Sequence, residues 1–246
     1  HYDTEKGNSP IGFRVMTKEQ QMSSTKSEQQ WKMKMSKTKA YQELVQQALK
    51  NGVQFHTVIN DKWYASVENM NFIVNTLQKD FIMPLKDNRC IALSKEEFDK
   101  GLFRKLQDCK LEDVTEVYLK GWERPVLLTE LRIKDGTDCA VTLYLVSSNL
   151  SLSKATILKR YKRRWKVEEA FKSMKSNLNL QKSPTHSKIA IQNHIFCVFL
   201  ATVELYFIAH YQKTNPFALK LNIYYKALKI AFNTTTQLRN ELKLTA

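Results

Sequence analysis

The chain is organised around the segment Tyr161-Lys-Arg-Arg-Trp-Lys-Val-Glu168-Glu-Ala-Phe-Lys-Ser-Met-Lys175. This segment contains no Pro or Gly and consists mostly of strong helix formers, so it predicts one continuous helix. At about 100° per residue, Arg164, Glu168 and Lys175 fall within about 60° of Tyr161 on a helical wheel. A phenol, a guanidinium, a carboxylate and an ammonium group are therefore expected to share one stripe. A carboxylate among so many cations should stay ionised, which suits a metal ligand beside bound phosphates.

Composition alone favours a plainer interpretation of this stretch, a solvent-exposed basic helix with ordinary ion pairs. Its spacing, Tyr-x2-Arg-x3-Glu-x6-Lys, argues for more. This pattern, with Arg-Trp-Lys-Val-Glu-Glu and Lys-Ser-Met-Lys-Ser around it, resembles the signature of the DDE transposases of bacterial insertion sequences, in the IS-four branch. The resemblance implies that Glu168 is a catalytic acid and a metal ligand. It also implies DNA phosphate contacts for Tyr161, Arg164 and Lys175, and Arg and Lys are natural phosphate partners.

A second informative stretch begins at Asp61. Residues 53–60 predict a short buried strand with Asp61 at its C-terminal end, where ligands gather in open α/β sheets. Ser66 is suited to cap a helix that continues to Leu77. On the residues alone, Asp61 is more simply a turn or capping residue. The order strand, Asp, two aromatics and helix resembles the family's block for its second catalytic Asp, which makes Asp61 the other catalytic metal ligand.

The resemblance implies the fold class α/β (α+β), with an RNase H-like catalytic core, a β-rich insertion domain that interrupts it, and closing C-terminal helices. We expect residues 1–40 to be an irregular remnant of the N-terminal part of the core. Residues 41–78 and 151–246 are expected to form its two main parts, the latter including the C-terminal helices, and residues 79–150 the insertion. Apolar runs between turn signals predict strands there at 81–85, 90–93, 115–119, 126–133 and 140–146.

Other segments carry simpler expectations. Residues 17–40 are rich in Lys, Gln, Ser and Met and predict a mobile loop that leads into a helix at 41–50. Residues 187–212 are apolar on nearly all sides and predict a buried helix. The apolar run from Ile195 to Ala209 is interrupted by Glu204 and is too short to span a bilayer, so no membrane partner is expected. Trp165 is expected to anchor the signature helix in the core.

The charge of the chain indicates a polyanionic partner. Among 246 residues, 39 Lys and Arg outnumber 24 Asp and Glu, which gives a net charge of +15. The cysteines, Cys90, Cys109, Cys139 and Cys197, are scattered and show no zinc-site or disulfide spacing, as in a reduced cytosolic protein. Together with the resemblance, this predicts double-stranded DNA, transposon ends and target DNA, as the partner. The expected location is the bacterial cytoplasm at the nucleoid, and a homodimer is expected in the DNA complex.

DNA cutting and joining is phosphoryl transfer, for which two Mg²⁺ ions about 4 Å apart are commonly held by carboxylates; Mn²⁺ can substitute. The family's first catalytic Asp lies on a strand that is expected upstream of His1. Asp3 is the nearest candidate, but it matches a family residue outside the catalytic triad. We therefore expect an incomplete copy with an inactive core. The alternatives are a catalytically dead DNA-binding remnant and a plain basic structural protein.

Overall fold

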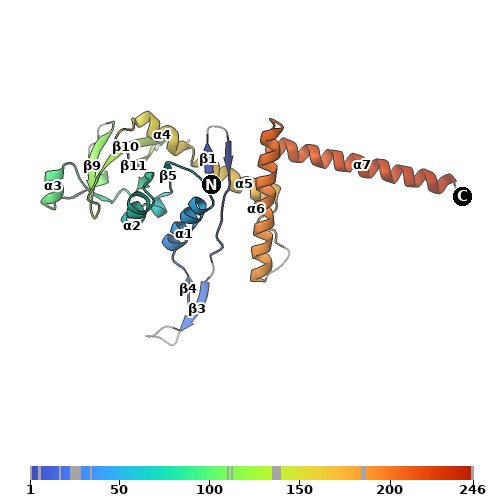
Figure 1. Cartoon of the computed structure of the whole chain (residues 1–246), viewed down its shortest axis with the longest axis horizontal. Helices are drawn as coiled ribbons and strands as arrows, with labels where there is room; N and C mark the ends of the chain where they lie inside the picture. Colours follow the sequence, from blue (N-terminus) through green and yellow to red (C-terminus); the bar gives the residue numbers. More distant parts are fainter. Residues whose placement is uncertain are drawn as a thin grey trace. The chain divides into compact units, whose positions relative to one another are not determined.

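The computed structural model describes residues 2–4, 7–16, 18–22, 29–33, 35–109, 111, 113–134, 140–183 and 187–244 (Figure 1). The chain divides into two compact units. One comprises His1–Ile11 and Lys166–Ala246, and the other comprises Gly12–Trp165. The boundary falls inside the signature stretch, directly after Trp165.

The unit Gly12–Trp165 is built on one mixed sheet of seven strands, in the order β5-β6-β11-β10-β9-β7-β8. The strands are β5 (Thr57–Ile59), β6 (Asp80–Leu85), β7 (Cys90–Ala92), β8 (Arg104–Lys105), β9 (Thr115–Leu119), β10 (Pro125–Lys134) and β11 (Ala140–Ser147). β5 and β6 run parallel, with Val58 opposite Phe81, while the other pairs are antiparallel. The predicted mixed α/β class and the five predicted strands are confirmed. The boundary between residues 78 and 79 stays a prediction, and β5 and β6 on its two sides belong to one sheet.

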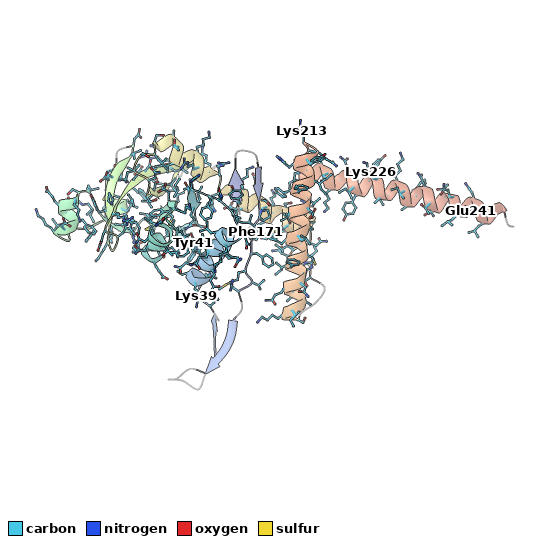
Figure 2. The ribbon with its side chains drawn as sticks, viewed as in Figure 1. Lys39, Tyr41, Phe171, Lys213, Lys226 and Glu241 are labelled. Carbon is cyan, nitrogen blue, oxygen red and sulfur yellow. The ribbon has the colours of Figure 1, made fainter. Side chains whose placement is uncertain are left out.

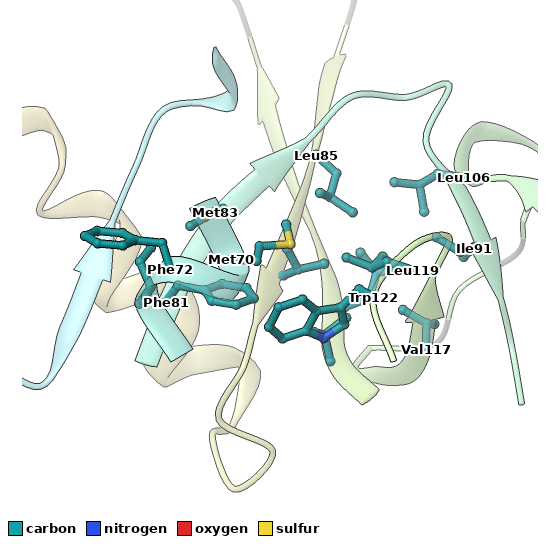
Figure 3. Packing of buried hydrophobic residues seen from close by; sticks show 14 residues of the cluster. Met70, Phe72, Phe81, Met83, Leu85, Ile91, Leu106, Val117, Leu119 and Trp122 are labelled. Carbon is teal, nitrogen blue, oxygen red and sulfur yellow. The ribbon is translucent and has the colours of Figure 1, made fainter. Parts of the chain in front are cut away.

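Side chains alternate between the two faces of this sheet, as the pleat of a strand requires. Phe81 and Met83 of β6 point into a cluster that also holds Met70 and Ile73 (Figure 3). These two come from α2 (Val67–Asn71) and η2 (Phe72–Thr76). Ile82 lies between Phe81 and Met83 and packs instead with residues of α4 (Lys154–Lys162) on the other face. Helices therefore cover both faces of β6.

Side-chain caps mark the N-termini of several helices in this unit. Ser66 accepts a hydrogen bond from the Asn69 amide at 3.2 Å, so α2 begins where predicted. Ser153 accepts a hydrogen bond from the Thr156 amide at 3.3 Å and caps α4 in the same way. α1 (Lys37–Lys50) is capped by Ser36 and starts four residues before the predicted helix. The remaining short helices are η1 (Lys62–Tyr64), α3 (Lys95–Asp99) and η3 (Leu106–Asp108).

The expectation of a loop over residues 17–40 is wrong in part. β3 (Lys18–Met22) and β4 (Gln29–Met33) form an antiparallel pair, with Gln20 opposite Trp31. Strand pairing is made by backbone groups and therefore does not require an apolar sequence, so low apolar content is a weak argument against it.

The signature stretch is not one helix, and that prediction is wrong. α4 ends at Lys162, residues 163 and 164 form a turn, and α5 (Trp165–Asn177) begins after it. The Arg163 amide bonds to the Arg160 carbonyl at 3.1 Å and the Arg164 amide to the Tyr161 carbonyl at 2.9 Å. These three-residue steps tighten the chain where α4 stops. Trp165 is 59% exposed, so it is not the expected core anchor.

The described residues of the other unit form a small hairpin and three helices. β1 (Tyr2–Thr4) pairs with β2 (Gly7–Ser9). α5 packs against α6 (Lys188–Tyr211) through Ala170, Met174 and Val198. α7 (Pro216–Leu244) follows, with residues 221–242 exposed, and Figure 2 shows its side chains, Lys226 and Glu241 among them. The closing helices are thus present as predicted.

The prediction that α6 is buried is wrong. Ile189, Phe207 and Tyr211 are 71%, 69% and 84% exposed, because only one side of the helix contacts α5. Among the described helices, α6 alone is long and apolar enough to cross a membrane by length and composition, with 11% of its apolar window buried. A single helix of this kind is weak evidence for a membrane protein.

We predict that Phe81→Ala lowers the free energy of unfolding by about 3–5 kcal/mol, because Phe81 is fully buried and its ring meets Trp122 edge to face at 5.9 Å. Leu102→Ala is the control, since Leu102 is 56% exposed and should change stability by less than about 0.5 kcal/mol. Urea denaturation followed by circular dichroism measures both. Equal losses for the two variants would contradict the core described above.

Candidate active site

Asp61 is the second residue after the C-terminal end of β5, and Asn60 lies between them. Asp61 caps η1, because its Oδ1 accepts a hydrogen bond from the Lys62 amide. The capping role considered from the sequence is therefore present. Its other oxygen, Oδ2, lies 3.9 Å from Nη1 of Arg164, and the Asp61 side chain is 49% exposed. A half-exposed carboxylate that uses only one oxygen for capping keeps the capacity to bind a cation.

Asn60 holds the chain in place immediately before Asp61. It is 5% exposed, and its amide exchanges hydrogen bonds with the Tyr41 hydroxyl at 2.8 and 3.0 Å. The Asn60 backbone amide bonds to the Ile82 carbonyl at 3.3 Å. These contacts extend the β5–β6 pairing by one residue and connect it to α1. The sequence analysis did not single out Tyr41 or Asn60. A polar residue at the end of an apolar strand is the signal that could have found Asn60.

Arg164 is brought to Asp61 by the turn that follows α4. Its guanidinium carbon lies 5.7 Å from the centre of the Tyr161 ring, and its side chain is 24% exposed. Arg160, one turn earlier, donates a hydrogen bond to the Thr57 hydroxyl at 3.3 Å and so attaches α4 to β5. The geometry therefore groups Tyr161, Arg164 and Asp61 within one unit.

Tyr161 is more buried than is expected for a residue that contacts DNA. It is 7% exposed and packs with Ile82, Leu145 and Ile157 on one face of the sheet. Its predicted contact with a DNA phosphate stays a prediction.

Glu168 and Lys175 lie in α5, in the other unit, and their association with Asp61 stays a prediction. Glu168 is half-buried in the first turn of α5, and Lys175 is exposed in the last turn. Each charge sits where the helix dipole favours it. Lys175 lies seven positions after Glu168, so the two residues lie on the same face of α5, about two turns apart.

The carboxylates of the described residues are the candidate ligands for a divalent metal. Carboxylate oxygens such as those of Asp61 suit hard cations such as Mg²⁺. No group of three or more His, Cys, Asp or Glu residues comes together in the described part of the chain. The suggestion from the sequence that Asp3 could replace the first catalytic Asp stays untested, because the Asp3 side chain lies outside the described part of the structure.

Residues 32–203, more than two thirds of the chain, match the model of a protein family described as Transposase DDE domain. No curated protein matches the sequence. The matched span contains every predicted site residue from Asp61 to Lys175.

We predict that Tyr41→Phe lowers the free energy of unfolding by about 1–3 kcal/mol, because the buried Asn60 amide loses its only side-chain partner in the described structure. Tyr64→Phe is the matched control: its ring stacks on Tyr41 at 4.9 Å, and its hydroxyl has no hydrogen bond to another described residue. Urea denaturation at neutral pH measures both variants, and equal losses would remove the anchoring role of the Tyr41 hydroxyl.

The same pair predicts a pH dependence. Burial raises the pKa of the Tyr41 phenol, and the Asn60 hydrogen bond opposes the shift. The folded chain therefore holds this proton more tightly than the unfolded chain, whose tyrosines titrate near pH ~10. The stability from this group is complete below that pH and is lost as the pH rises toward the raised pKa. We expect the free energy of unfolding of Tyr41→Phe to fall less steeply than that of the wild type as the pH rises above ~10.

Proposed function

Because the chain belongs to the family of transposases with a DDE domain, we propose that it acts at the ends of an insertion sequence of the IS-four branch, cutting and joining DNA by metal-dependent phosphoryl transfer. The geometric observation that supports this is Arg164 beside Asp61 at 3.9 Å. It places a phosphate-binding group next to a metal-binding group at the C-terminal end of a strand, where α/β sheets bind ligands.

We propose Asp61 and Glu168 as the acids that hold the metal, Mg²⁺ with Mn²⁺ as a substitute; divalent metals are in general use in this family. When bound, such an ion would activate the nucleophile and stabilise the negative charge at the phosphate. Arg164 holds a phosphate oxygen pair through its planar guanidinium and offsets the charge that builds up there. Lys175, exposed on the face of α5 that carries Glu168, is the second phosphate contact, and Tyr161 is the third proposed contact.

The partner in this proposal is double-stranded DNA, the transposon end and the target, with a homodimer in the DNA complex. The net charge of +15 supports a polyanionic partner. The site of action is the bacterial nucleoid in the cytoplasm.

A second candidate function is a DNA-binding remnant of a transposase without catalysis. The observation that favours it is that no three potential metal ligands come together among the described residues. The two candidates share the DNA surface and differ in whether a metal binds.

We predict that Arg164→Ala and Lys175→Ala each weaken binding to duplex transposon-end DNA and flatten its salt dependence by about 0.9 in the log–log slope, because each removes one phosphate contact. Lys226→Ala removes the same charge from the exposed part of α7 and is the control. Fluorescence anisotropy over a range of salt concentrations measures the three variants. If the control matches the two test variants, the phosphate contacts are not where we place them.

We also predict that the unmodified 246-residue chain shows no strand transfer above background, because two identified acids provide too few ligands for a pair of ions. Mn²⁺ should bind in the presence of DNA, and Asp61→Asn and Glu168→Gln should each weaken that binding in an electron paramagnetic resonance titration of free Mn²⁺.

Glu169→Gln is the neighbouring control, since Glu169 pairs with Lys166 at 2.9 Å. Wild-type DNA binding without any Mn²⁺ binding would favour the remnant. Robust Mg²⁺-dependent strand transfer would overturn the prediction and direct attention to Asp3.

A further inference from the structure

A cavity of about 430 Å³ lies beside η1 in the unit Gly12–Trp165. Its wall includes Lys62 and Trp63, which directly follow Asp61, and Lys86 and Arg89 from the turn after β6. Lys120, from the turn after β9, completes the cationic lining. The size suits a group as large as one nucleotide. The sequence analysis did not predict this site.

The charged side chains in the lining of this pocket are all positive. Four cationic side chains line it, and no Asp or Glu is among the residues of the lining. None of the four forms an ion pair with a described residue. The Arg89 Nε is buried and has no hydrogen-bond partner among the described residues, and its Nη2 reaches the Lys120 carbonyl only at 3.5 Å. Converging cations whose buried donor is unsatisfied are suited to an anion.

Trp63 adds an aromatic surface to the pocket. Its side chain is 75% exposed, although a large apolar ring is normally covered. The ammonium groups of Lys37 and Lys86 lie 5.8 and 5.9 Å from the ring centre. These contacts alone would explain a surface Trp held by cation–π attraction. They leave unexplained why the ring borders a cavity that has room for a ligand.

We propose that this pocket binds one unpaired nucleotide of a DNA strand, with its phosphate on Arg89, Lys86 and Lys120 and its base stacked on Trp63. Exposed aromatics beside cations are how proteins bind single-stranded DNA without sequence preference, because every base has a face that can stack. A base inside a duplex has both faces covered by its neighbours and cannot use Trp63 in this way. The proposal rests on the proposed function, because Asp61 and Trp63 are held by the same η1 turn.

The test compares a labelled single-stranded oligo(dT) with a fully paired duplex in fluorescence anisotropy titrations of the full chain. We expect Trp63→Ala to weaken oligo(dT) binding about ten-fold and duplex binding less than about two-fold. Lys86→Gln should weaken oligo(dT) binding and flatten its salt slope by about 0.7. Tyr225→Ala, an aromatic that is 69% exposed on α7, and Lys50→Gln, an exposed cation of α1, are the matched controls. Loss of oligo(dT) binding no greater than in the controls would overturn the proposal.

Cys90 provides a readout that does not depend on a substitution, because it lines the pocket and is partly accessible, while Cys197 is exposed in the other unit. Oligo(dT) should slow alkylation of Cys90 and leave Cys197 unchanged, as measured by mass spectrometry of the two peptides. Equal protection by the duplex, or protection by a phosphopeptide but not by oligo(dT), would overturn the proposal.

This experiment separates the pocket from the proposed function. If Arg164→Ala and Lys175→Ala leave duplex binding intact while Trp63→Ala weakens oligo(dT) binding, the proposed phosphate contacts fail and the pocket stands. The reverse result removes the pocket alone.

Discussion

The unit Gly12–Trp165 depends on β6, which pairs in parallel with β5 on one side and antiparallel with β11 on the other. Five of its six residues are buried, because helices cover both faces of the strand. A strand enclosed in this way fixes the register of β5. The position of Asp61, two residues beyond β5, is therefore set by the core and is further secured by the hydrogen bonds of Asn60. Tyr41 attaches α1 to Asn60, just beyond the C-terminal end of β5, and Arg160 attaches α4 to Thr57 at the start of the strand.

The turn at residues 163 and 164 has a consequence for the proposed chemistry. In a continuous helix, Arg164 would share one stripe with Glu168, whereas the turn places Arg164 at Asp61 within the same unit. A partly exposed pair at 3.9 Å contributes little to stability. Its value is positional, because a phosphate held by Arg164 would lie beside Asp61. The pocket around Trp63, with its four cationic side chains, begins at the next residue, Lys62. A DNA strand bound at Asp61 would therefore have a second basic surface within reach.

Much of the sheet could be predicted from sequence, since strands such as β6 and β11 are apolar runs bounded by turn residues. The cap at Ser66 could also be predicted, and α2 starts there as expected. The end of α4 could not be predicted, because no Pro or Gly marks it and the tertiary packing of Tyr161 overrides the local helix propensity. The exposure of α6 was missed because apolarity on all sides indicates burial only where a partner covers the helix. The site residues were named from a motif, but the pocket around Trp63 joins segments far apart in the sequence, which no local pattern reveals.

The central claim is that Asp61 and Glu168 hold the same metal site when the chain binds DNA. The most direct measurement is a crystal structure of the chain with transposon-end DNA and Mn²⁺, in which the anomalous signal locates each ion. The account predicts Mn²⁺ in contact with both carboxylates, with the two carboxyl groups closer than about 8 Å, as a pair of ions ~4 Å apart requires. Carboxylates on opposite faces of the sheet, or Mn²⁺ bound by neither, would contradict it.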